Sequence, residues 1–308
     1  MLAIGESLRY SNLSLSGYNR NTTPNLDSLE NIMLYTNYYS TATLTMYSVP
    51  LIYTRATPNN LGLAYRERGL HVPFKETGFK TYVVCCNNLL NYEHYLSDGV
   101  DSLISVKSDI EIPPIIDSLT STNEKLFIAI QFWGNHGLYT NFSPDFNVYR
   151  PNPIGDDVSW ENKEGKVNAY DNTVLQQDYV MTKIIKAIDK PFTSSSFLFV
   201  SDHGEDLRPG SGGHGGSCRP DKAEYHVPLI IWNSKTWIDN NPSKYKTLRR
   251  NRNVPCNADN IFYSICDMAD INLHERYIKK EWSLLSDLFE PHDRLLLLPD
   301  GRTYIHLN

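Results

Sequence analysis

The chain has 308 residues, a length that suits one large α/β domain or two smaller domains. Hydrophobic residues make up 41% and charged residues 21%, the composition of an ordinary globular protein, which argues against disorder along most of the chain. The formal net charge is -6, and Lys and Arg form no long run, so these features argue against a nucleic-acid partner.

Short apolar runs alternate with helical patterns, which predicts a mostly parallel central sheet sandwiched by helices. The predicted strands, in chain order, are Leu2–Ile4, Thr81–Cys85, Leu126–Phe132, Phe197–Ser201 and Leu229–Trp232. The predicted helices are Asn25–Glu30, Thr45–Leu51, Leu61–Glu76, Ala169–Ile188 and Asn257–Ala269. Residues 138–168 are rich in Pro, Asn, Gly and Asp and predict a long surface loop. The turn at 299–302 predicts a terminal β-hairpin and thus a small C-terminal β-containing region.

The apolar runs, the start of the chain and the cysteines bear on where the protein is located. No run approaches the roughly 20 apolar residues of a membrane span. Leu2–Ile4 nevertheless reads as the end of a buried strand directly at the start, so we expect that further sequence precedes Met1 in a longer protein. The five cysteines form no CxxC pair, which argues against a cysteine-rich zinc site and leaves the disulfide pattern open.

Polar residues follow three of the predicted strands. Glu6 comes after the first, His136 after the third, and Asp202-His203 after the fourth. In open parallel sheets, ligands bind beyond the carboxyl ends of the strands, and carboxylates and imidazoles are ligands for zinc and similar metals. A further histidine, His214, lies in a glycine-rich run that suggests close backbone approach to a ligand. The alternatives are a helix-start carboxylate, a capping Asp in a turn, and an incidental histidine in a flexible loop.

The segment Ser40–Pro50 is dense in hydroxyl groups. A hydroxyl at a helix N-terminus either caps the helix or acts as a nucleophile, with backbone N–H groups and the helix dipole stabilising phosphate oxygens. A metal beside the hydroxyl would lower its pKa and supply the alkoxide.

Several motifs, in this order, closely resemble the catalytic domain of bacterial phosphoethanolamine transferases, which belong to the alkaline phosphatase and sulfatase superfamily. The motifs span roughly residues 2–235, and the last 70 or so residues match less distinctly. They are Gly5–Arg9, Leu13–Arg20, Thr23–Leu26, Thr43–Pro50, Gly134–Gly137, Tyr170–Thr173 with Asp178–Val180, Ser201–Glu205 and Val227–Leu229. The resemblance implies a single sulfatase-like catalytic domain over residues 1–308.

The resemblance also implies roles for particular residues. Glu6, Thr43, Asp202 and His203 would hold the principal metal, Zn²⁺ or another divalent ion such as Mn²⁺. Thr43 would be the nucleophile and would attack the phosphorus of phosphatidylethanolamine. Three further residues would bind the substrate phosphate or a second metal, namely His136, His214 and Asn88.

The family transfers the group to lipid A, a core sugar or another envelope glycan. It carries N-terminal transmembrane helices and places this domain in the periplasm, at the inner membrane. Two departures leave the acceptor open: the segment Asn87–His94 contains no lysine, and Thr41 and Leu51 stand where many relatives have disulfide-forming cysteines. The alternatives are a phosphoglycerol transferase or phosphodiesterase, a non-catalytic binding protein, and a sulfatase. Sulfatase activity is disfavoured because Ile52 stands where a sulfatase motif has Arg.

Overall fold

A computed structural model of the chain describes residues 1–86, 95–96, 98–211 and 213–307. Its centre is a seven-stranded sheet in the order β2-β8-β7-β1-β6-β4-β5. Adjacent strands run parallel except that β8 is antiparallel to both β7 and β2. The strands are β1 Leu2–Gly5, β2 Ile32–Tyr35, β4 Lys80–Cys86, β5 Ser102–Val106, β6 Leu126–Gln131, β7 Ser196–Ser201 and β8 Leu229–Asn233.

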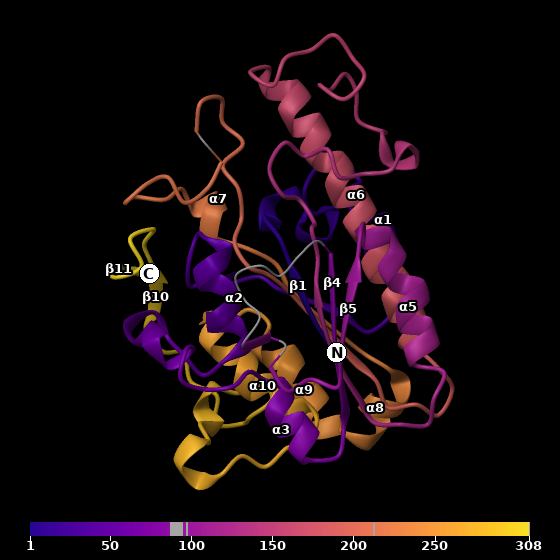
Figure 1. Cartoon of the computed structure of the whole chain (residues 1–308), viewed down its shortest axis with the longest axis vertical. Helices are drawn as coiled ribbons and strands as arrows, with labels where there is room; N and C mark the ends of the chain where they lie inside the picture. The colour runs from indigo at the N-terminus through magenta and orange to yellow at the C-terminus, as the bar shows by residue number, and fades with distance from the viewer. Residues whose placement is uncertain (87–94, 97, 212, 308) are drawn as a thin grey trace.

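Helices cover both faces of this sheet, as the alternating pattern predicted (Figure 1). Successive strand residues point to opposite faces, so Leu2 and Ile4 enter one core and Ala3 enters the other. The first core packs against α2 Thr45–Tyr53, α3 His71–Glu76, α8 Lys235–Asn240, α9 Pro242–Asn251 and α10 Ile261–Met268. The second packs against α1 Pro24–Asp27, α5 Ile112–Leu119 and α6 Lys163–Ile188. The predicted fold class is therefore confirmed.

Two predicted segments differ from the structure. The segment Leu61–Glu76 is not one helix, since a 3-10 helix ends at Leu63 and α3 begins at His71. Gly69 lies between them, and a Cβ there would stand 2.0 Å from the backbone oxygen of Tyr95, so the chain passes too close to its neighbour to hold a side chain. Helix α6 also begins earlier than predicted, because the side chain of Asn162 caps it by accepting from the N–H of Gly165.

Smaller elements complete the fold. The predicted terminal hairpin is present as β10 Arg294–Leu297 and β11 Tyr304–Leu307. Two further short strands, β3 Tyr38–Tyr39 and β9 Cys256–Asn257, pair in parallel. Within the described residues, none of the helices combines the length and apolar character that crossing a bilayer requires.

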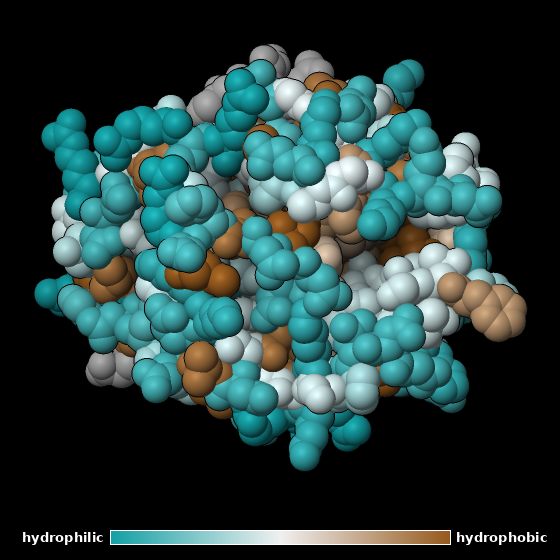
Figure 2. Space-filling model, turned by 90° about the horizontal axis from the view of Figure 1, so that it is seen from below, coloured by the Kyte–Doolittle hydropathy of each residue, from teal (hydrophilic) through white to brown (hydrophobic). Residues whose placement is uncertain are grey.

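An apolar cavity of about 520 Å³ opens at the amino ends of the strands, between residues that include Met1, Phe79, Leu126 and Trp237. Figure 2 views the molecule from this side and shows apolar side chains recessed among polar ones. The polar strand-end residues singled out in the sequence lie at the opposite, carboxyl end of the sheet.

Candidate metal centre

The centre forms where β1 and β7 end side by side. Gly5 pairs with Ser201 in register, so the residues that follow them, Glu6 and Asp202, emerge as neighbours. The backbone N–H of Ser7 donates to Asp202 Oδ1 at 3.0 Å, which holds this carboxylate in place. The next turn needs Gly204, because a Cβ there would stand 2.0 Å from the backbone oxygen of Ala223.

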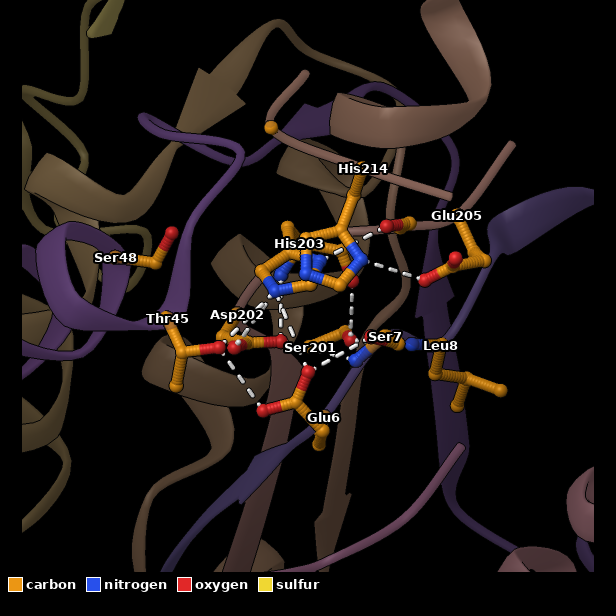
Figure 3. Close-up of polar contacts among 12 residues, drawn as sticks. Glu6, Ser7, Leu8, Thr45, Ser48, Ser201, Asp202, His203, Glu205 and His214 are labelled. Atoms are coloured by element: carbon orange, nitrogen blue, oxygen red, sulfur yellow. Dashed lines mark hydrogen bonds and ion pairs between the residues drawn. The ribbon is translucent and has the colours of Figure 1, made fainter. Parts of the chain in front are cut away.

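Glu6, Asp202 and His203 meet in a buried cluster (Figure 3). His203 Nε2 lies 3.3 Å from Glu6 Oε1 and 3.4 Å from Asp202 Oδ2. With His214, Glu6 and His203 offer ligand atoms that all lie within 4.8 Å of one another. Four of the residues predicted from the sequence are thus brought together.

The donor set fits a divalent cation. His203 Nδ1 lies 2.9 Å from the backbone oxygen of Gly204, an acceptor, so Nδ1 carries the hydrogen and the lone pair of Nε2 faces the two carboxylates. Asp202 Oδ2 is buried and has no hydrogen-bond partner. Burial and the neighbouring charge of Glu6 raise the pKa of Asp202 well above its usual range. A metal ion would satisfy the unpaired oxygen and the facing lone pair together.

Two hydroxyl groups reach the cluster, that of Ser7, which donates to Glu6 Oε1 at 2.7 Å, and that of Thr45 from the hydroxyl-rich segment. Thr45 Oγ1 donates to Glu6 Oε2 at 3.0 Å and lies 3.1 Å from His203 Nε2 (Figure 3). Thr45 is the first residue of α2, so its side chain stands at the helix N-terminus, which adds a positive dipole end and free N–H groups.

Thr43, which the sequence predicted to be a metal ligand and the nucleophile, makes no hydrogen bond to the cluster. Its side chain is buried and its hydroxyl makes no hydrogen bond. Residue 44 is extended and the helix begins at residue 45, and it is Thr45, two residues further along, whose hydroxyl reaches Glu6 and His203.

The predicted accessory residues fall in three different places. His214 joins the cluster, and its ring centroid lies 4.0 Å from that of His203. His136 is exposed and packs its ring on Trp133 at a centroid distance of 4.4 Å, and the group that could hold a metal does not include it. Asn88 lies outside the described residues.

Sequence reasoning missed Glu205 and Tyr139. Glu205 Oε2 accepts from His214 Nδ1 at 2.8 Å, and its Oε1 accepts from the Tyr139 hydroxyl at 3.0 Å. Burial raises the pKa of Glu205, but the hydrogen bond and charge of His214 outweigh burial and hold that pKa below its usual value. Glu205 could have been found because it closes the run Asp202–Glu205, next to two predicted metal ligands. Its contact with Tyr139 could not, because no sequence pattern links the two positions.

The chain is similar in sequence to curated phosphoethanolamine transferases. The phosphoethanolamine transferase EptA of Helicobacter pylori is 30% identical over 283 residues, which cover 86% of this chain and 52% of that protein. The Kdo(2)-lipid A phosphoethanolamine 7''-transferase of Escherichia coli is 24% identical over 294 residues, covering 90% of this chain and 49% of that protein. The chain therefore spans about half the length of these curated relatives.

Solved structures show the same fold. The C-terminal periplasmic domain of EptC from Escherichia coli superposes with a TM-score of 0.85 at 20% identity, over 99% of this chain and 91% of that one. The integral membrane transferase EptA from Neisseria meningitidis gives 0.79 at 21% identity, over 92% of this chain and 56% of that one. The sulfatase family model matches residues 1–271. The chain is therefore a member of the sulfatase family, with a fold shared by phosphoethanolamine transferase domains.

Proposed function

We propose that this chain is the catalytic domain of a metal-dependent phosphoethanolamine transferase, and that it moves phosphoethanolamine from phosphatidylethanolamine to an envelope glycolipid or glycan. The observation that carries the proposal is the contact of the Thr45 hydroxyl with Glu6 and His203 at 3.0 and 3.1 Å, in a buried carboxylate and imidazole cluster. A threonine hydroxyl is a weak nucleophile unless a metal or a base activates it, and this cluster can supply both.

Glu6, Asp202, His203 and the Thr45 hydroxyl would hold Zn²⁺, which would lower the pKa of the hydroxyl and offset charge on the phosphate. Glu6 Oε2 already accepts the hydrogen bond of this hydroxyl, so it is placed to hold the departing proton. Thr45 Oγ1 then bonds to phosphorus as the bond to the glycerol oxygen breaks, and diacylglycerol leaves with a proton. A phosphoethanolamine ester of Thr45 remains.

In the second half of the reaction, an acceptor oxygen attacks the same phosphorus, and the Thr45 oxygen leaves and regains a proton. The N-terminus of α2 favours the anionic phosphate in both halves, because its first N–H groups and its dipole end point toward Thr45. His214 lies beside the cluster and can complete the ligand set.

The relatives support the transferred group, the metal and the setting. The Helicobacter pylori relative is named phosphoethanolamine transferase EptA. One solved structure of an Escherichia coli EptC domain is described as a complex with Zn. Another relative is named for Kdo(2)-lipid A, so we propose lipid A, a core sugar or a similar envelope glycan as acceptor. EptC domains are described as periplasmic and one EptA as an integral membrane protein, so we propose a periplasmic domain anchored to the inner membrane.

Donor labelling tests this function. Zinc-loaded protein is mixed with phosphatidylethanolamine labelled in its ethanolamine, and separately with phosphatidylglycerol labelled in its headgroup glycerol. Label is expected on the protein with the first donor only, to be chased onto lipid A extracts and lost with a chelator. Label from phosphatidylglycerol alone would replace the proposal with a phosphoglycerol transferase. Rapid turnover of a chromogenic sulfate ester would replace it with a sulfatase.

A further inference from the structure

Glu205 is held on both of its oxygens. Its Oε1 accepts from the Tyr139 hydroxyl at 3.0 Å, and its Oε2 accepts from His214 Nδ1 at 2.8 Å (Figure 3 shows the second contact). Only 2% of Glu205 and 3% of Tyr139 are exposed, so water does not compete for these bonds. A carboxylate that is bonded at one oxygen only can turn about its last torsion, which is broad. The Tyr139 hydroxyl therefore fixes the direction of the oxygen that faces His214.

The backbone near Tyr139 is strained in a way that brings its ring inward. Leu138 and Tyr139 have φ values of 69° and 39°, in the left-handed region that side chains other than glycine disfavour by about 1–2 kcal/mol each. The Tyr139 ring packs edge-on against Tyr170 at a centroid distance of 5.2 Å. Such strain persists only where the surroundings hold it, and it is common at functional sites.

Gly213 also lies against the Glu205 carboxylate and leaves room for it. A Cβ at Gly213 would stand 2.2 Å from Glu205 Oε1, and Gly213 has a φ of +92°. The N–H of Asp206 donates to the Gly213 backbone oxygen at 2.7 Å, which holds this glycine against the carboxylate. The loop that carries His214 therefore closes over Glu205 only because position 213 has no side chain.

These contacts determine how His214 meets the cluster. A carboxylate accepts hydrogen bonds, so His214 Nδ1 carries a hydrogen and the other ring nitrogen is left for the cluster that includes Glu6 and His203. We propose that Tyr139 is a positioning residue that, through Glu205, holds His214 with Nε2 presented to the metal centre. The inference rests on the proposed metal-dependent function and adds to it the coupling between the turn after β6 and the ligand set.

Tyr139→Phe removes one hydroxyl and keeps the ring. Tyr179→Phe is the matched control, because Tyr179 packs its ring against Phe146 and its hydroxyl has no hydrogen bond among the described residues. ¹⁵N-histidine NMR of the metal-free protein reports the His214 tautomer, with the signal assigned by its loss in His214→Ala. Chelator competition reports zinc affinity.

The wild type and the control should show His214 with hydrogen on Nδ1, and Tyr139→Phe should show mixed tautomers and roughly tenfold weaker zinc binding, the lower end of the range for outer-shell partners of metal ligands. An unchanged tautomer and affinity in Tyr139→Phe would overturn the proposal, as would equal losses in both tyrosine variants.

If Tyr139→Phe does not fold, Glu205→Ala decides: a retained tautomer overturns the proposal, and a lost one supports it. Neither readout requires transfer, so an inactive wild type would overturn the proposed function while leaving this inference to its own result.

Discussion

Replacing Thr45 with alanine removes the hydroxyl that contacts Glu6 Oε2 and His203 Nε2 at 3.0 and 3.1 Å. The hydroxyl has a single hydrogen, which it donates to the Glu6 carboxylate, so one hydrogen bond is lost, which corresponds to about 1–3 kcal/mol of folding free energy. Domains of this kind are stable by about 5–15 kcal/mol, so the variant should remain folded. Removing a nucleophile that forms a covalent intermediate reduces kcat by about 10⁶-fold in a well-studied serine enzyme, so we expect a loss of about 10⁴- to 10⁶-fold here.

Thr43→Val is the matched control two residues away. The Thr43 hydroxyl is buried without a hydrogen bond, so replacing it with a methyl group of similar size should leave stability unchanged or raise it by about 1 kcal/mol. Transfer should stay within about threefold of wild type, an estimate that follows from the absence of any contact between this hydroxyl and the cluster. Thr45→Ser keeps a hydroxyl at the same place and should keep most of the activity.

The assay is intact-protein mass spectrometry after incubation with phosphatidylethanolamine in the absence of acceptor, followed by peptide mapping. A phosphoethanolamine adduct should appear on Thr45 in the wild type and in Thr43→Val, and be missing in Thr45→Ala. Zinc content and the melting temperature are measured on each protein, so that metal loss and unfolding are recognised. An adduct on Thr43, or wild-type transfer by Thr45→Ala, would show that Thr45 is not the nucleophile.

Three further changes test the site and its support. Asp202→Asn should raise the melting temperature of the metal-free protein, because it removes one of two neighbouring buried carboxylates. The same variant should bind zinc at least tenfold more weakly. Thermal melts with and without zinc would measure both effects. Burial raises the pKa of Asp109 from 3.8 to about 6, so the folded state binds this proton more tightly than the unfolded state does. The free energy of unfolding should therefore fall by up to about 3 kcal/mol as the pH rises from 4 to 6. Urea titrations of the metal-free protein would measure this fall, and Asp109→Asn should reduce it. Gly213→Ala should cost about 2–4 kcal/mol by the same titration, since its Cβ meets Glu205, whereas Gly210→Ala, with a similar φ and open space, should cost only about 1 kcal/mol.

The central part of the fold was predictable because its signals are local. Strands β1, β6 and β7 are nearly continuous apolar runs, which is how strands buried on both faces read. Strand β5 was missed because it lies at the sheet edge and alternates between exposed and half-buried residues, with only Val106 fully buried. The break before α3 was missed because it depends on the contact between Gly69 and Tyr95, which local periodicity does not contain.

The residues of the candidate site likewise include some that local sequence signals predict and some that they do not. Glu6, Asp202 and His203 follow strands directly, so the rule that ligands bind at the carboxyl ends of parallel strands finds them. The contact between Tyr139 and Glu205 joins residues 66 apart in the sequence, through a turn with two positive φ values. The sequence does not predict these positive φ values, because Leu138 and Tyr139 are not residue types that favour the left-handed region.

Thr43 and Thr45 differ in their position relative to the start of α2, and this physical criterion distinguishes them better than resemblance to a short motif does. The hydroxyl-rich segment offers several candidates, and resemblance alone selected Thr43. The same sequence predicts a helix that begins at Thr45, and a hydroxyl that attacks a phosphate benefits from standing at a helix N-terminus. Applied together, the two statements select Thr45, whose hydroxyl is the one that contacts Glu6 and His203. A residue two positions before a helix start has neither the dipole nor the free N–H groups beside its side chain, which is why we propose Thr45 rather than Thr43 as the nucleophile.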